Sequence, residues 1–227
     1  MKAEHNHIKK LTEDFISESI RHENPAGLCF GTSFPLLIYL ATKQIKSSLI
    51  KGGVPQPKAD GTIQNVPHYW LQIDSEDIIL DPTIQQFKNP DPIYIGKLQD
   101  NEITKKYIPN NLKCDSWFHE DFDGWKKPYE DSTFPLDGPF EKRSITYTIK
   151  LATILHAEIK KLNSVDESIN RLFGLYFRPI YFFLYHWHTE VINFKITKEN
   201  LPTGFDSLLS DVLQWQKDEH QKQNKIS

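Results

Sequence analysis

The sequence predicts a protein of the α+β class, in which helices pack on an antiparallel sheet and a mainly helical region follows. Apolar residues in 8–22 recur at the spacing of one helix face. Residues 66–73 and 78–81 are two strand-like apolar runs separated by the acidic turn DSED. Helical spacing returns in 144–162 and in 205–221, so the C-terminal region should contain helices.

The composition of the 227-residue chain is that of a folded protein. Hydrophobic residues make up 38% of the chain, which is ample for a buried core and argues against wholesale disorder. The net charge of −3 and the pI near 6.3 provide no global field for phosphate groups, so we expect no nucleic-acid partner.

Other features bear on where the protein resides. Residues 1–15 lack the apolar segment of a secretory signal, and two cysteines cannot form a disulfide framework. The most apolar window, 172–188, is interrupted by Arg178 and Pro179 and is short for a membrane span. We interpret this window as buried core or as a partner surface. We therefore expect a soluble, cytoplasmic protein without a membrane span, and signal-less export and the oligomeric state stay open.

Two helices are predicted before the strand pair. The first, 8–22, is followed by a proline and a glycine that oppose its continuation. The second, 33–50, should begin with Ser33 as its N-cap and Pro35 in its first turn, where a missing N–H costs little. Residues 51–61, with several glycines and prolines, then form a loop.

The strand pair determines which side chains face each other. Paired positions in a hairpin sum to a constant, so a four-residue turn pairs Ile73 with Ile78 and Leu71 with Leu80. The alternative, a two-residue turn, pairs Ile73 with Glu76. We favour the four-residue turn because it brings two leucines together on a face that suits a core.

His68 and Asp81 lie on the same face of the sheet in either register. The two-residue turn places them directly opposite, with Cβ atoms roughly 5 Å apart, and the four-residue turn places them diagonally, at about 7–8 Å. A carboxylate beside an imidazole orients the ring and stabilises its protonated form. Taken alone, the pair also fits an ordinary surface hydrogen bond.

The region 88–140 is rich in prolines and is predicted to be irregular, with short strands such as 92–98. Helical spacing resumes after Pro139. We therefore predict a catalytic core of residues 1–140 and a helical, aromatic-rich region of residues 141–227, which can pack onto the core as one domain.

Cys29 supplies a possible nucleophile for the His–Asp pair, because it directly precedes an apolar helix. Helix N-termini carry a partial positive charge, which favours a thiolate. Pro35 follows six residues later, which argues that Cys29 lies in the turn before the helix. With His68 as base and Asp81 orienting it, Cys29 would complete the arrangement for nucleophilic acyl transfer. The other interpretation of Cys29 is a small buried hydrophobic residue.

These residues resemble the transglutaminase-like branch of the papain-like cysteine enzymes. That family has a Cys at the start of a helix, then a strand with His followed two positions on by Trp or another aromatic residue, then a strand that ends in Asp-Pro-Thr. The corresponding residues are Cys29, HYW at 68–70 and DPT at 81–83. The resemblance covers residues 22–88 and implies a papain/transglutaminase-like core of helices packed on an antiparallel sheet.

The resemblance implies a Cys29-His68-Asp81 triad that acts on an amide bond of a protein or peptide through a thioacyl intermediate, without a cofactor. Water is the default acceptor, which gives a peptidase, amidase or deamidase. An amine acceptor would instead give a transglutaminase or N-acyltransferase. A catalytically inactive protein-binding module of the same fold is a further alternative. Arylamine N-acetyltransferases share the triad order, but the residues around Cys29 and after Asp81 fit that family poorly.

The residues that would bind the oxyanion or the substrate are less clearly marked. The backbone N–H of Cys29 is a natural oxyanion donor. The amide side chains of Asn24, Gln64 and Asn65 are candidates for a second donor, and Trp70 is a candidate for substrate contact.

Two histidine-containing segments were weighed as metal ligands. HWH at 186–188 would place two histidines on one face of a strand, and 117–123 offers His119 beside carboxylates. Neither has the spacing of a zinc site, so we predict no bound metal. Cys114 is interpreted as an incidental or structural thiol.

Overall fold

The computed structural model describes the backbone of residues 2–20, 27–73, 78–110, 114–130, 139–193 and 203–223. The chain divides into two compact units, residues 1–122 and 123–227, whereas the sequence predicts a boundary near residue 140. Helix α3 (Cys114–Glu130) runs across this division. The architecture is α+β, as predicted from the sequence. Within the described ranges, no helix is both long and apolar enough to cross a membrane.

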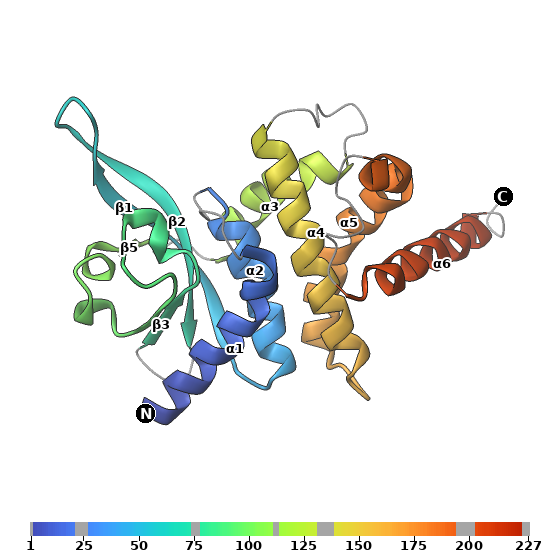
Figure 1. The fold of residues 1–227 in the computed structure, drawn as a ribbon, viewed down its shortest axis with the longest axis horizontal. Helices are drawn as coiled ribbons and strands as arrows, with labels where there is room; N and C mark the ends of the chain where they lie inside the picture. Colours follow the sequence, from blue (N-terminus) through green and yellow to red (C-terminus); the bar gives the residue numbers. More distant parts are fainter. Residues whose placement is uncertain are drawn as a thin grey trace. The chain divides into compact units, whose positions relative to one another are not determined.

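The first unit is built on an antiparallel sheet, with the strand order β4-β3-β2-β1-β5 in the described part of the chain. The strands are β1 (Ser47–Pro57), β2 (Ile63–Ile73), β3 (Ile78–Asp81), β4 (Tyr94–Gly96) and β5 (Ile108–Pro109). β1 and β2 form a long hairpin that extends beyond the other strands (Figure 1). This hairpin carries His68 near the middle of β2.

The pairing of β2 with β3 confirms the four-residue turn. Leu71 pairs with Leu80, and Ile73 pairs with Ile78. Asp81 therefore lies diagonally across from His68, on the same face of the sheet. The two strands thus bring the imidazole and the carboxylate together through local pairing alone.

The predicted helix over 33–50 is wrong at both ends. Helix α2 spans Cys29–Thr42, and the chain then turns at Gln44, whose φ of 62° is left-handed, before it enters β1. Ser47–Ile50 are therefore strand residues, and the predicted loop over 51–61 is mostly the β1–β2 hairpin. The pattern misled because an apolar segment and a Gly-Gly pair fit a helix end as well as a buried strand.

Helix α2 begins earlier than predicted, at Cys29. Ser33 is not the N-cap, which is Leu28, and Pro35 lies inside the helix. An interior proline removes one helical hydrogen bond, which normally disfavours a helix. The completely buried side chains of Phe34, Leu36 and other α2 residues offset that loss, because burial against β1 and β2 stabilises the helix as a whole.

The sheet of the first unit is covered on both sides. Helix α1 (Lys2–Ile20) and α2 lie on one side of the strands, and the segment 84–107, apart from β4, lies on the other (Figure 1). The latter segment contains three short 3-10 helices: η1 (Ile84–Phe87), η2 (Leu98–Asp100) and η3 (Thr104–Lys106). Its side chains, including Phe87 and Tyr107, pack with Trp70 in a buried cluster.

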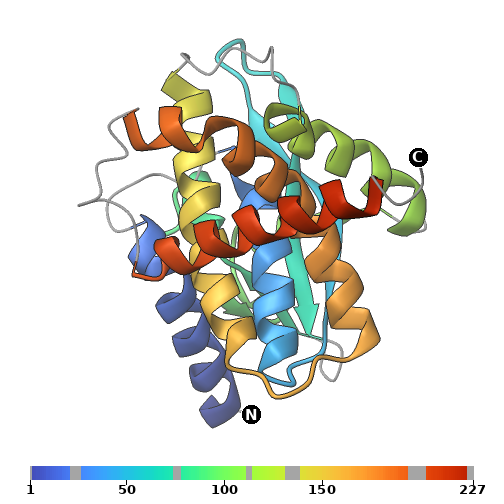
Figure 2. The same ribbon diagram turned by 90° about the vertical axis from the view of Figure 1, so that its right-hand side faces the viewer.

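The second unit is helical, as predicted for residues 141–227, whereas α3 is a helix within 88–140, which was predicted to be irregular. The second unit contains α4 (Pro139–Lys160), α5 (Glu167–Asn193) and α6 (Phe205–Gln223). Helix α6 runs across α4 and α5 (Figure 2), and Asp211 of α6 accepts a hydrogen bond from buried His156 of α4 at 2.9 Å.

The aromatic window 172–188 is part of α5, and its described residues Tyr176, Phe177 and Phe183 are buried. This agrees with the interpretation as core. The HWH segment is helical, so the strand that the metal hypothesis required is absent there. The side chains of His119 and Cys114 lie outside the described residues.

Candidate active site

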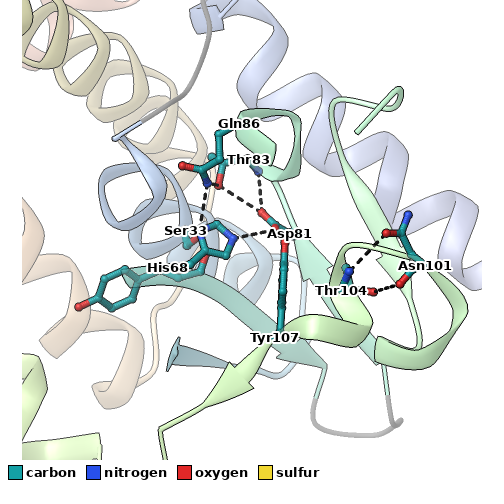
Figure 3. Close-up of polar contacts among 9 residues, drawn as sticks. Ser33, His68, Asp81, Thr83, Gln86, Asn101, Thr104 and Tyr107 are labelled. Atoms are coloured by element: carbon teal, nitrogen blue, oxygen red, sulfur yellow. Dashed lines mark hydrogen bonds and ion pairs between the residues drawn. The ribbon is translucent and has the colours of Figure 1, made fainter. Parts of the chain in front are cut away.

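The centre of the site is a buried ion pair between His68 of β2 and Asp81 at the end of β3. Both side chains are completely buried. Nε2 of His68 lies 2.7 Å from Oδ2 of Asp81. Figure 3 shows the imidazole between Asp81 and Gln86, with one ring nitrogen directed toward each. The ring orientation is therefore set from two sides.

Four hydrogen bonds satisfy the buried carboxylate of Asp81. Oδ1 accepts the backbone N–H of Thr83 at 2.8 Å and the Thr83 hydroxyl at 3.2 Å. Oδ2 accepts from His68 and from the Tyr107 hydroxyl. The Asp-Pro-Thr sequence explains half of this network, because a short acidic side chain readily binds the N–H two residues on.

The environment of His68 favours its charged form. Burial opposes protonation, but the charge and hydrogen bond of Asp81, joined by a hydrogen bond and charge interaction with Cys29, raise the pKa of His68 from 6.5 to about 9. These interactions therefore favour the imidazolium form, paired with the Asp81 carboxylate.

Aromatic side chains enclose the imidazole. The ring centroids of Phe87, Tyr107 and Trp70 lie 4.8, 5.3 and 5.9 Å from that of His68. Burial and the adjacent Asp81 charge raise the pKa of the Tyr107 phenol, so it stays protonated and donates to Asp81. This apolar surround strengthens the electrostatic interactions within it.

Cys29 is the first residue of α2, and its side chain is partly exposed and not in a disulfide. The first N–H groups of a helix have no acceptor within that helix, and they create a partial positive charge. Ser33, one turn along α2, donates to the carbonyl of Tyr69 at 3.3 Å, which ties the helix to β2 beside His68. This attachment holds Cys29 close enough to His68 to influence the pKa of the imidazole.

The structure thus brings Cys29, His68 and Asp81 together, and Trp70 lies beside them. Gln64 and Asn65 lie elsewhere. They are exposed residues in the outer part of β2, roughly 10–13 Å along the strand from His68. The position of Asn24 falls outside the described residues.

The sequence hypothesis assigned no role to three residues of this site. Thr83 and Gln86 lie shortly after Asp81, so the DPT turn was the signal that could have indicated them. Tyr107 is 26 residues from Asp81 in the sequence and has no local signal at all. Only the packing of the 84–107 segment on the sheet brings it into contact.

A second polar group lies near Cys29 on the same unit. The hydroxyl of Tyr69 donates to Asp121, which also forms an ion pair with Lys51. Burial, the Asp121 hydrogen bond and the charges of Asp121 and Cys29 raise the pKa of Tyr69. The phenol therefore stays neutral beside the thiol.

The described residues contain no group of three or more His, Cys, Asp or Glu side chains that could hold a metal ion. Comparisons with models of protein families, with curated proteins and with solved structures found no significant match to this chain. The chemistry of the site must therefore be inferred from its own residues.

Proposed function

We propose that the protein is a cysteine-dependent enzyme that acts on an amide bond of a protein or peptide through a thioacyl intermediate. Cys29 is the nucleophile, His68 the general base and acid, and Asp81 the residue that orients His68. Within this proposal the first unit is a papain/transglutaminase-like core, and water is the default acceptor of the acyl group.

The proposal depends on one observation: the side chains of Cys29, His68 and Asp81 lie next to one another in that order. A thiol at a helix N-terminus lies close enough to a buried imidazole to influence its pKa, and that imidazole pairs at 2.7 Å with a fully hydrogen-bonded carboxylate. Burying such a pair is costly, and a fold needs no charge here for packing alone. A thiol held beside an imidazolium is the arrangement that favours a thiolate nucleophile.

The reaction follows from these positions. Nε2 of His68 is engaged by Asp81, so the proton exchange with Cys29 is assigned to Nδ1, which also lies 3.0 Å from the amide nitrogen of Gln86. Sγ of Cys29 attacks the carbonyl carbon, and His68 gives its proton to the leaving nitrogen as the C–N bond breaks. Water then attacks the thioester while His68 takes its proton, and that proton returns to Sγ as the carboxylate product leaves. Backbone N–H groups at the start of α2 are the natural donors to the oxyanion.

The reactivity of Cys29 tests the proposal without a known substrate. The full chain is treated with iodoacetamide at mildly acidic pH, and the rate of adduct formation at each cysteine is measured by peptide mass spectrometry. We expect Cys29 to react faster than an ordinary thiol and to lose that advantage in His68→Gln. Asp91→Asn, an exposed carboxylate change, is the control and should leave the rate unchanged. A Cys29 that reacts no faster than free cysteine would argue for an inactive binding module.

The acyl acceptor is a separate question with its own experiment. A peptide library is incubated with the protein, with and without a primary amine, and the products are analysed by mass spectrometry. Cleaved or deamidated peptides would indicate water as the acceptor, as we expect, and amine adducts would indicate a transglutaminase or N-acyltransferase. Cys29→Ala is the control for both.

A further inference from the structure

Gln86 closes a ring of hydrogen bonds around the His68–Asp81 pair. Its amide nitrogen lies 3.0 Å from Nδ1 of His68 and 3.2 Å from the hydroxyl oxygen of Thr83. That hydroxyl donates to Oδ1 of Asp81 at 3.2 Å, and Oδ2 of Asp81 binds Nε2 of His68. Figure 3 shows the side chains of Gln86, Thr83 and Asp81 around the imidazole of His68.

The donors and acceptors in this circle of hydrogen bonds can be assigned in one consistent way. The Thr83 hydroxyl uses its only hydrogen on Asp81, so it accepts an N–H from Gln86. The second N–H of the same amide points to Nδ1, which must then offer a lone pair. The neutral imidazole satisfies this when its proton is on Nε2 and is donated to Asp81. A reversed amide would instead draw the Thr83 hydrogen away from the buried carboxylate.

We propose that Gln86 is a positioning residue of the site: its side-chain N–H binds the lone pair of Nδ1 and so favours the neutral state of His68 in which Nδ1 is the proton acceptor. The inference rests on the proposed function, since it assigns Gln86 a part in the same proton transfer. The proposed function assigns the same lone pair to the proton exchange with Cys29, and Gln86 counteracts the charges that otherwise hold the ring protonated.

The ionisable groups that face His68 come from three other elements. Asp81 approaches from β3, Cys29 from α2, and Tyr107 from the residues before β5. Asp81 favours the imidazolium, and the Tyr107 phenol is neutral. In the described surroundings, Gln86 is the side chain that donates to a ring nitrogen of His68 and thereby stabilises the uncharged ring.

The test is the titration of His68, followed through the ring nitrogen resonances by NMR in the full chain. Cys29→Ala is the background, so that His68 titrates as a single group rather than as a coupled pair. Removal of one hydrogen bond to the neutral ring should raise the pKa of His68 by about half a unit to one unit in Gln86→Met. The Nδ1 resonance of the neutral ring should also lose the shift that an accepted hydrogen bond causes.

Gln85→Met is the matched control, because Gln85 is the exposed neighbour in the same 3-10 helix. It should leave both the pKa and the Nδ1 resonance unchanged. An unchanged pKa in Gln86→Met would overturn the inference. A lowered pKa would overturn it as well, because the reversed amide would then be the one that binds Nδ1.

A second variant guards against misfolding of the first. In Gln86→Glu a carboxylate replaces the amide donor, so the pKa of His68 should rise further than in Gln86→Met, and an unchanged value would again contradict the role of Gln86. This titration is independent of thiol reactivity. A Cys29 that reacts no faster than an ordinary thiol would contradict the proposed function. A pKa of His68 that does not change in the Gln86 variants would contradict only the role of Gln86.

Discussion

Asp81 is the residue that gives His68 its charge, and its own burial depends on neighbours that donate hydrogen bonds. The backbone and hydroxyl of Thr83, the ring of His68 and the phenol of Tyr107 supply them. A buried carboxylate without such donors would carry a large desolvation cost. The site is therefore held by groups on both sides of Asp81, from the following turn and from the segment before β5.

Substitution of Asp81 by Asn should reverse the direction in which the pKa of His68 is shifted. Burial is the largest single influence on the ring and Asp81 is its main opponent, so without the carboxylate we expect the pKa of His68 to fall from about 9 to below its ordinary 6.5. NMR titration of the ring measures this. The exposed change Asp91→Asn should leave the pKa unaltered. A pKa that stays near 9 in Asp81→Asn would mean that Asp81 is not the source of the shift.

The Tyr107 hydroxyl should contribute measurably to stability. Tyr107→Phe keeps the ring that packs against Trp70 but removes one donor to a buried carboxylate, so we expect a loss of about 2 kcal/mol in the free energy of unfolding. Urea unfolding measures it. Tyr94→Phe is the control, because that hydroxyl binds an exposed carbonyl and should cost much less. Equal losses in the two variants would contradict the importance of the Asp81 contact.

At the scale of elements, Gly52 lets β1, β2 and β5 meet next to the site. Gly52 pairs with His68 on β2 and with Pro109 on β5. A Cβ at this position would lie 2.3 Å from Cη2 of Trp70 and 2.5 Å from the carbonyl of Ile108. The indole of Trp70 therefore rests directly on the β1 backbone, and that position keeps it beside the imidazole.

Gly52→Ala should displace Trp70 or β5. We expect a loss of about 1–3 kcal/mol in the free energy of unfolding from overpacking, together with changed NMR resonances of His68. Gly124→Ala in α3 is the control, because its Cβ would meet nothing within 4 Å and alanine favours a helix. Urea unfolding compares the two. A Gly52→Ala variant as stable as the wild type would show that Trp70 is not confined there.

Helix α2 illustrates how tertiary contacts override local preference. Ser33 as a possible N-cap and Pro35 in the first turn predict a helix that starts at residue 33, yet it begins at Cys29. Burial along α2 and the Ser33–Tyr69 hydrogen bond hold its first turn against β2. Cys29, the proposed nucleophile, thus owes its place at a helix N-terminus to packing.

At the scale of the whole molecule, the ion pair should make stability depend on pH. His68 binds its proton more tightly when folded, so its contribution is complete below pH 6.5 and is lost as the pH rises through about 9. The free energy of unfolding of the wild type relative to His68→Gln should fall by on the order of 3 kcal/mol across this range.

Because the chain forms two compact units, the pH dependence must be measured on the unit that contains His68. Urea unfolding followed through the NMR resonances of β2 reports that unit, and the resonances of α4 provide an internal control that should not share the trend. Parallel pH curves for the wild type and His68→Gln in β2 would contradict the linkage.

The sequence by itself determined the features that depend on short-range periodicity. The β2–β3 hairpin, its four-residue turn and the helices of the C-terminal unit follow from apolar spacing and loop length, and so does the placement of His68 near Asp81. The tertiary structure alone decided that α2 starts at Cys29, that 47–57 is a strand and that Tyr107 lies against the imidazole. The physical reason is that burial and hydrogen bonding between distant segments outweigh the local preferences that a sequence pattern records.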